Sequence, residues 1–151
     1  MDIRQLEKDE DLPIELLLEA DPSEKLVRKY VSKGISFIAE KDFRLIGIYV
    51  LLPISNTKVE IKNIAVAASE RGKGCGKKLV QHALAEAQRL GFETVEIGTG
   101  NSSFDQLALY QKCGFRMTSI DRGFFTRHYL EPIIENGILC QDMVRLEYKI
   151  R

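Results

Sequence analysis

The stretch from 59 to 91 constrains this chain most, because it places three glycines between two regular patterns. Val59 to Val66 is rich in β-branched side chains and predicts a strand, and from 77 to 90 apolar residues recur at helical spacing. Gly72, Gly74 and Gly76 stand at alternate positions in the connection. Glycine lacks a Cβ atom, so its backbone adopts positive φ and approaches a ligand closely. Because the first amides of a helix lack internal partners and carry partial positive charge, the unit predicts a phosphate-binding turn.

Two common phosphate-binding loops have a different spacing. A Walker loop places four residues between its first glycine and a Gly-Lys pair and continues with Ser or Thr, whereas here three residues separate Gly72 from Gly76-Lys77, and Lys78 follows. The dinucleotide fingerprint G-x-G-x-x-G begins directly after its strand, whereas here residues 67–71 intervene before a G-x-G-x-G pattern. The spacing therefore argues against an ATP-dependent enzyme and against a dinucleotide-binding enzyme. An ordinary glycine-rich turn without a ligand is the structural alternative.

Composition sets further bounds. A length of 151 residues and a hydrophobic fraction of 44% predict a single domain, 1–151, with a packed core. The 22 Lys and Arg residues balance 22 Asp and Glu residues, and this zero net charge argues against a nucleic-acid partner. The longest apolar run, Ile46 to Leu52, is too short to span a membrane. The polar first residues carry no signal-peptide pattern.

The cysteines complete these bounds. Cys75, Cys113 and Cys140 are odd in number and widely spaced, so they form no zinc or redox motif, and no metal is expected. A reducing, cytoplasmic location is the simplest expectation for such a chain.

The remaining periodicities predict a mixture of strands and helices. Apolar runs on both sides of residues 41–44 predict an antiparallel hairpin. The succession of strand, helix and strand between 59 and 98 predicts a right-handed parallel crossover. The expected strands are 3–6, 35–40, 45–52, 59–66, 94–98, 115–119 and 143–150, the expected helices are 12–20, 22–33, 77–90 and 104–113, and 121–142 is expected to be irregular.

Three local signals refine this outline. Asp21 suits the N-cap of the second helix. Ser103 and Gln106 have the spacing of a capping box at the start of the fourth helix. Strict alternation along the strand before the glycines places Glu60 and Asn63 on opposite faces of the sheet.

The glycine turn resembles the acyl-coenzyme A loop of the GNAT N-acetyltransferase superfamily. The loop of that family reads Gln or Arg, two residues, Gly, one residue, then Gly or Ala, and this chain has Arg71-x-x-Gly74-x-Gly76. The order of the expected elements is similar to that family along nearly the whole chain, and to its small bacterial members in particular. The resemblance implies an α/β (α+β) fold, with a mixed, mostly antiparallel sheet flanked by helices and two parallel central strands that splay apart.

A second motif adds to the resemblance. It contains Asn101, then Tyr110 and Lys112, and ends in Gly114-Phe115. The family has a similar Asn…Tyr-x-Lys-x-Gly-Phe run, in which the asparagine contacts the pantetheine arm of the coenzyme and the tyrosine hydroxyl faces its sulfur. The resemblance therefore implies that Tyr110 protonates the leaving thiolate. A buried aromatic residue that anchors its helix is the structural alternative for Tyr110.

The resemblance also implies that acetyl-coenzyme A is the co-substrate. Loop amides would hold the pyrophosphate, and the end of the strand before the loop would pair with the pantetheine arm as an added strand does. Cys75 is interpreted as a packing residue, since transfer in the family is direct and forms no acyl-cysteine. The implied coenzyme contacts are Ile64, Ala65, Val66, Arg71, Gly72, Lys73, Gly74, Cys75, Gly76, Lys77 and Asn101.

The attacking amine must be neutral, so the reaction needs a base or a chain of waters. Glu60 is the first candidate, because family members often use a carboxylate near this position on the central strand. His128 is the second candidate, since its ordinary pKa suits proton transfer near neutral pH. His82 lies on the helix after the loop and is expected to face solvent.

The segment 121–142 is the expected acceptor region. It is too long for a tight hairpin loop, and it combines aromatic and charged residues. Phe125, His128 and Tyr129 are the candidate substrate contacts, with Glu131 or Glu135 near the amine of the acceptor. A plug at the end of the sheet and a homodimer contact are the alternatives for these aromatic residues.

Together these features predict transfer of an acetyl group from acetyl-coenzyme A to a primary amine of a small molecule or peptide by direct attack. The alternative is a catalytically silent coenzyme-A-binding sensor or interaction module. The presence of both Asn101 and Tyr110 favours the enzyme, because a sensor needs no acid for a thiolate.

Overall fold

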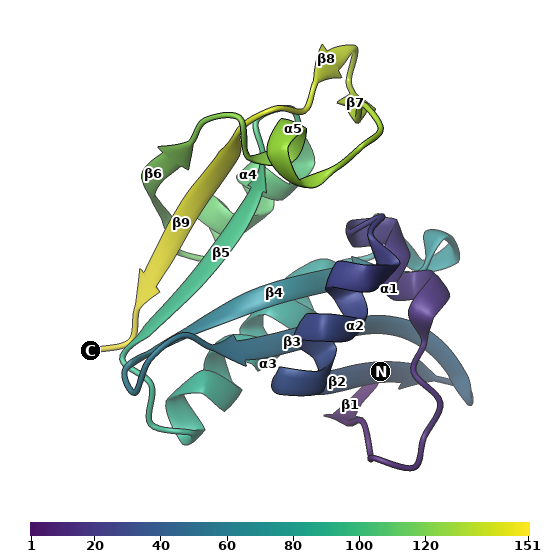
Figure 1. Ribbon diagram of the computed structural model, residues 1–151. Coiled ribbons are helices and arrows are strands. Elements are labelled where there is room, and N and C mark those ends of the chain that lie inside the picture. The colour runs from purple at the N-terminus through teal and green to yellow at the C-terminus, as the bar shows by residue number, and fades with distance from the viewer.

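A computed structural model describes all residues, 1–151, and Figure 1 shows its elements. In chain order they are β1 (Asp2–Gln5), α1 (Ile14–Ala20), α2 (Glu24–Lys33), β2 (Ile35–Lys41), β3 (Arg44–Pro53), β4 (Lys58–Val66), the 3-10 turn η1 (Ala68–Glu70), α3 (Cys75–Arg89), β5 (Thr94–Gly100), α4 (Phe104–Lys112), β6 (Arg116–Asp121), α5 (Phe124–His128), β7 (Ile134–Glu135), β8 (Ile138–Leu139) and β9 (Met143–Lys149).

Seven strands form one mixed sheet in the order β1-β2-β3-β4-β5-β9-β6. Its neighbouring strands pair antiparallel except β4 and β5, which pair parallel. The parallel pairing runs only from Lys58 with Thr94 to Ile61 with Ile97. Beyond Ile61 the two strands diverge, and Figure 1 shows the opening between them. The mostly antiparallel sheet with a splayed parallel pair is therefore confirmed.

Helices cover both faces of the sheet and enclose two cores. The apolar faces of α1 and α2 pack on one side, and α3 and α4 pack on the other. Leu17, Val27 and Tyr30 lie in the first core, and Leu79 and Val80 lie in the second. No helix of the structure has the length and apolar character needed to cross a membrane.

A β-bulge interrupts β4 and corrects the prediction of strict alternation. The pairing of β4 with β3 steps from Ile61 to Asn63, so Lys62 is an extra residue without a partner. A bulge of this kind shifts all following side chains to the other face. Ile61 therefore packs in the core beneath α3, whereas Asn63 bonds to groups of α1 and α2. Glu60 and Asn63 consequently share a face of the sheet, contrary to the prediction.

Two predicted helix caps are also wrong. The N-cap of α2 is Ser23, whose hydroxyl accepts from the amide of Leu26 at 3.3 Å, and Asp21 instead accepts from the amide of Ser23 at 3.1 Å. Ser103 does precede α4, but it makes no side-chain cap. Its hydroxyl donates to Glu135 Oε1 at 3.0 Å, a partner supplied by a distant segment.

The segment 121–142 has regular structure, contrary to the expectation of an irregular loop. It contains α5 and the small hairpin of β7 and β8, whose turn is Asn136-Gly137 with both residues at positive φ. The side chain of Asn101 binds the C-terminal end of this segment. Its Nδ2 donates to the carbonyl of Leu139 at 3.1 Å, and its Oδ1 accepts from the amides of Gln141 and Asp142 at 2.8 and 3.0 Å. The segment is therefore tied to the carboxyl end of β5.

Candidate functional site

A cavity of about 570 Å³ lies at the end of β4, between the glycine loop, α3 and α4; we call it the loop cavity. This volume is typical of a small-molecule or cofactor site. Most of the residues predicted to bind the coenzyme line it. The lining residues are Glu19, Ala20, Ile64, Ala65, Val66, Glu70, Arg71, Gly72, Gly74, Cys75, Gly76, Lys77, Asp105, Gln106, Leu109 and Tyr110.

The glycine loop has the geometry of an anion site. Gly72 and Gly74 adopt φ values of 76° and 84°, and apart from the adjoining residues no heavy atom lies within 4 Å of the position where either would carry a Cβ atom. Gly74 precedes α3 and supplies no side chain to cap it, while its carbonyl accepts from the amide of Lys78. The first amides of this 15-residue helix thus stay available to a ligand in the cavity.

Carboxylates already partner the two loop cations predicted to meet phosphate. Arg71 Nη2 lies 3.3 Å from Glu19 Oε2, and its Nε donates to the carbonyl of Val66 at 3.2 Å. Lys73 lies 3.4 Å from the buried Glu70 and does not line the loop cavity. Only Arg71 and Lys77 of the loop cations border the space that a ligand would occupy.

A second cavity of about 480 Å³ lies beside the first, with α5 on one of its walls; we call it the α5 cavity. Five residues line both cavities: Glu19, Ala20, Ile64, Gln106 and Tyr110. The cavities therefore adjoin one another beside the end of β4. The other lining residues of the α5 cavity are Leu18, Asp21, Pro22, Glu60, Ile61, Lys62, Asn63, Ile97, Gly98, Thr99, Gly100, Ser103, Phe124, Phe125, Tyr129, Ile133, Glu135, Cys140 and Met143.

Tyr110 stands at the junction of the two cavities. Its side chain is 4% exposed, and its ring packs against Phe115 with ring centroids 6.2 Å apart. Burial, with a smaller contribution from Cys113, raises the pKa of Tyr110 above its ordinary value. The hydroxyl therefore stays protonated and can donate a proton or a hydrogen bond to a group in either cavity.

Glu60 lines the α5 cavity from β4 and is 9% exposed. Burial raises its pKa, while Lys62 and Arg145 oppose the rise and Glu96 adds to it. The two cations lie 3.9 and 4.0 Å from Glu60 Oε2. A carboxylate with a raised pKa that shares a cavity with Tyr110 has the chemistry of a general base.

Aromatic rings of α5 and its C-terminal end form one wall of the α5 cavity. Phe124 meets Phe125 edge to face at 5.1 Å between ring centroids, and Phe125 stacks on Tyr129 at 5.7 Å. His128 packs on Phe124 with centroids 4.6 Å apart but does not line the cavity. Its predicted roles as base and substrate contact are therefore not supported by its position, because one turn of α5 cannot aim every residue inward.

The structure separates the two acidic candidates near the acceptor, since Glu135 lines the α5 cavity and Glu131 does not. The prediction for His82 needs correction. His82 does not simply face solvent: its Nδ1 lies 2.7 Å from the hydroxyl of Tyr49, and its ring meets Phe37 edge-on at 5.6 Å between centroids.

Asn101 also lies elsewhere than its predicted role requires. It lines neither cavity, and both polar ends of its side chain bond to backbone groups of 139–142. Asn63 and Asp21, which the sequence did not single out as site residues, do line the α5 cavity. No local signal could have identified Asn63, because its orientation depends on the bulge.

Comparisons with known proteins bear on this arrangement. Residues 2–115 match the model of the "Acetyltransferase (GNAT) family". The chain belongs to the GNAT acetyltransferase family. Its relatives include a Bacillus subtilis (strain 168) protein named "Uncharacterized N-acetyltransferase YvbK", which is 54% identical over 140 residues that cover 93% of this chain and 90% of the relative.

Solved structures of other GNAT proteins superpose closely. A structure described as "IAA acetyltransferase from Bacillus cereus ATCC 14579" is 50% identical, has a TM-score of 0.96 and covers 99% of both chains. A GNAT family acetyltransferase from Elizabethkingia anophelis with acetyl-CoA bound is 42% identical, has a TM-score of 0.97 and covers 99% of this chain and 97% of its own. Both likenesses extend over the whole sheet and therefore include β6 and β9, which lie beyond the matched residues 2–115.

Proposed function

We propose that this GNAT protein transfers the acetyl group of acetyl-coenzyme A to a primary amine of a small molecule or peptide, with residues 1–151 acting as one catalytic domain. The observation that carries the proposal is the meeting of the two cavities at Tyr110. The loop cavity takes the coenzyme and the α5 cavity takes the acceptor. The thioester then lies at their junction, within reach of groups from both sides.

The coenzyme assignment rests on the loop and on β4. The amides that open α3 bind the pyrophosphate, and the end of β4 pairs with the pantetheine arm, since β5 has diverged from it there. The acetyl-coenzyme A in the Elizabethkingia anophelis relative supports this choice of ligand. The residues assigned to the coenzyme are Ile64, Ala65, Val66, Arg71, Gly72, Gly74, Cys75, Gly76 and Lys77.

The reaction assigned to this site is direct acyl transfer. Glu60 accepts a proton from the incoming ammonium group, and the neutral amine attacks the thioester carbon. Backbone amides of β4 stabilise the oxyanion. As the carbon–sulfur bond breaks, the hydroxyl of Tyr110 donates its proton to the thiolate. The products are an N-acetylated amine and free coenzyme A.

The direct test is an amine screen with acetyl-coenzyme A in which release of the free thiol is followed. Thiol release that depends on an amine, together with an acetylated product in mass spectrometry, supports the enzyme. A sensor would bind acetyl-coenzyme A in calorimetry and release no thiol with any amine.

The loop assignment predicts a large loss of affinity in the Gly74→Val variant. A valine at φ 84° is strained, and its side chain would fill the open space above the helix amides. We expect acetyl-coenzyme A to bind about a hundredfold more weakly, which is the loss of roughly two charge-assisted hydrogen bonds. Calorimetry measures the dissociation constant.

Gly91→Val is the matched control for this variant. Gly91 has φ 90° and equally open surroundings, but it follows the other end of α3 and lines neither cavity. The control therefore carries the same backbone strain without a ligand contact. Equal affinities of the two variants would contradict the assignment of the loop.

The acceptor assignment predicts different effects for two residues of α5. Phe125 lines the α5 cavity and His128 does not, so Phe125→Ala should raise KM for the acceptor about tenfold through lost apolar contact. His128→Ala should leave that constant within about twofold, and neither change should alter KM for acetyl-coenzyme A. Steady-state kinetics with each substrate varied in turn tests both. Unchanged constants in Phe125→Ala, with a dimer that dissociates in ultracentrifugation, would make these rings an interface.

A further inference from the structure

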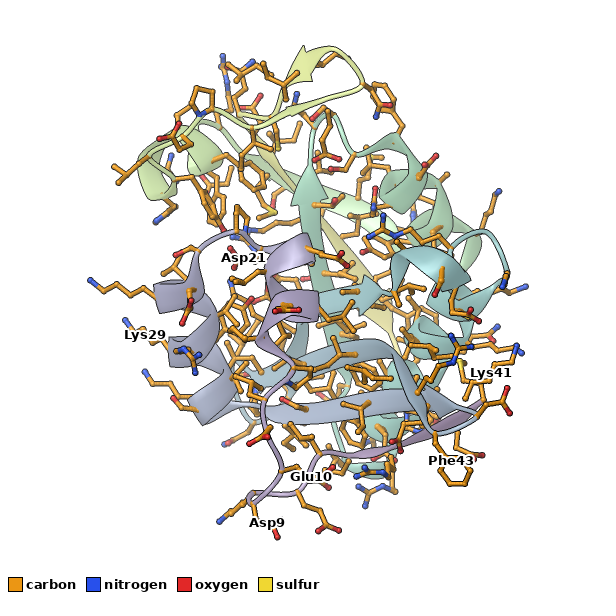
Figure 2. The ribbon with its side chains drawn as sticks, turned by 90° about the vertical axis from the view of Figure 1, so that its right-hand side faces the viewer. Asp9, Glu10, Asp21, Lys29, Lys41 and Phe43 are labelled. Atoms are coloured by element: carbon orange, nitrogen blue, oxygen red, sulfur yellow. The ribbon has the colours of Figure 1, made fainter.

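One hydrogen bond joins two walls of the α5 cavity that are far apart in the sequence. The hydroxyl of Tyr129, at the end of α5, donates to Asp21 Oδ1 at 2.8 Å across 108 residues. Asp21 lies in the connection between α1 and α2, and Figure 2 shows it where these helices approach the C-terminal half of the molecule. It is the one hydrogen bond between residues 1–34 and the segment 121–142.

The bond is the last in a chain that starts on the central sheet. Asn63 Nδ2 donates to the hydroxyl of Tyr30 at 2.9 Å and to the carbonyl of Leu17 at 3.1 Å. The hydroxyl of Tyr30 in turn donates to Asp21 Oδ2 at 3.1 Å. Each hydroxyl group thus has a defined direction of donation, and such chains strengthen their members.

Burial makes the inner part of this chain rigid. Asn63 and Tyr30 are only 4% and 6% exposed, so their bonds are shielded from competing water. Asn63 takes its place because the bulge at Lys62 turns it toward α1 and α2. Asp21 is therefore held from the side of the sheet, whereas Tyr129 reaches it from the C-terminal end of α5, a five-residue helix, and is half-buried.

We propose that the bond between Tyr129 and Asp21 closes the acceptor side of the site and limits the acceptors of this protein to small amines rather than peptides. The inference rests on the proposed function and adds the substrate class. Asp21 and Tyr129 both line the α5 cavity, so their bond fixes the separation of the α1–α2 wall from the α5 wall. A cavity of about 480 Å³ holds a small molecule, whereas an extended peptide needs these walls to part.

The charges and the apolar surface of the α5 cavity suit a small amine as the acceptor. Besides Glu60, the carboxylates of Glu19, Asp21 and Glu135 line the cavity, with Lys62 as the one Lys or Arg among the lining residues. The rings of Phe125 and Tyr129 supply an apolar face. An amine with a compact aromatic or aliphatic body satisfies both the acidic and the apolar surfaces.

The test compares acceptors of increasing size in the wild type and in Tyr129→Phe. The probes are 2-phenylethylamine, a dipeptide and a heptapeptide, the last two with an N-terminal phenylalanine. We expect the wild type to prefer 2-phenylethylamine to the heptapeptide in kcat/KM. Tyr129→Phe keeps the ring and loses the bond, so the ratio of heptapeptide to 2-phenylethylamine should rise about tenfold, as for the loss of one hydrogen bond to a charged group.

Two further variants separate closure from simple loss of stability. Asp21→Ala should raise the ratio of heptapeptide to 2-phenylethylamine in kcat/KM, as Tyr129→Phe does. The double variant should raise this ratio little further, because both substitutions remove the bond between Tyr129 and Asp21. Tyr49→Phe is the control, since it also loses one partly buried hydrogen bond, to His82 on the opposite face of the sheet. An unchanged ratio in Tyr129→Phe, an equal rise in Tyr49→Phe, or a wild type that prefers the heptapeptide would each overturn the inference.

Hydrogen exchange gives a measurement that does not depend on turnover. Loss of the bond should increase exchange of the amides of α5 in Tyr129→Phe and Asp21→Ala but not in Tyr49→Phe. Unchanged exchange in the first two variants would overturn the closing role even if every variant were inactive. A wild type that binds acetyl-coenzyme A and acetylates no amine would instead overturn the proposed function.

Discussion

Tyr110→Phe should lower kcat by about 10²- to 10⁴-fold, the usual contribution of a positioned general acid. The change removes one oxygen atom at the junction of the two cavities and leaves the ring that packs on Phe115. The leaving thiolate then departs without a proton donor. Affinity for acetyl-coenzyme A should change little, because the loop and β4 supply the contacts assigned to the coenzyme.

The measurement is single-turnover kinetics with saturating acetyl-coenzyme A, supported by calorimetry for the binding step. Tyr148→Phe is a suitable control, since Tyr148 also packs on Phe115, with centroids 5.7 Å apart, and lines neither cavity. A normal kcat in Tyr110→Phe would return Tyr110 to the role of a packing residue. A large loss of kcat in the control would show that the aromatic cluster as a whole, rather than the hydroxyl, is needed.

Glu60→Gln should have a similarly large effect, with kcat lower by about 10²- to 10⁴-fold. Glutamine keeps the shape of the side chain and cannot accept a proton from the ammonium group of the acceptor. Glu96→Gln is the matched control, because Glu96 pairs with Glu60 across β4 and β5, bonds to the same Arg145 and lines neither cavity. Equal losses in the two variants would indicate that the charge network, rather than a base, is what Glu60 supplies.

The pH dependence provides an independent test of Glu60. Burial raises its pKa above the ordinary 4.5, and a base is active only when ionised. The kcat of the wild type should therefore fall as the pH falls through this raised pKa, with the acid limb above pH 4.5. Glu60→Gln should lack that limb. A wild-type profile that is flat down to pH 4.5 would contradict the assignment.

Local chemistry explains why most of the coenzyme contacts expected from the sequence line the loop cavity. Positive φ at Gly72 and Gly74, free amides at the start of a helix, and a preceding strand all lie within one short stretch. Glycine spacing and hydrophobic period report such a unit directly. Tyr110 could also be identified from local sequence, because its place on one face of a helix and the following Gly114-Phe115 position its ring.

The α5 cavity depended on contacts between distant segments, which no local pattern encodes. The bulge at Lys62 follows from the register of β4 with β3, and it reverses the predicted face of Asn63. Asp21 has the signature of a helix cap, yet its carboxylate bonds to the hydroxyl of Tyr129 across 108 residues. In the same way, Ser103 bonds to Glu135 instead of capping α4.

The sequence by itself thus determined the family, the order of the elements outside 121–142 and the glycine turn between β4 and α3, because these depend on the conformations open to neighbouring residues. Only the tertiary structure decided which side chains line the α5 cavity: Phe125 and Tyr129 do, whereas His128, from the same short helix, does not. The physical reason is that a side chain takes the partner that folding brings near it. Because the pair is buried, its hydrogen bond or ion pair contributes more to stability than the helix cap or turn that the local sequence could form instead.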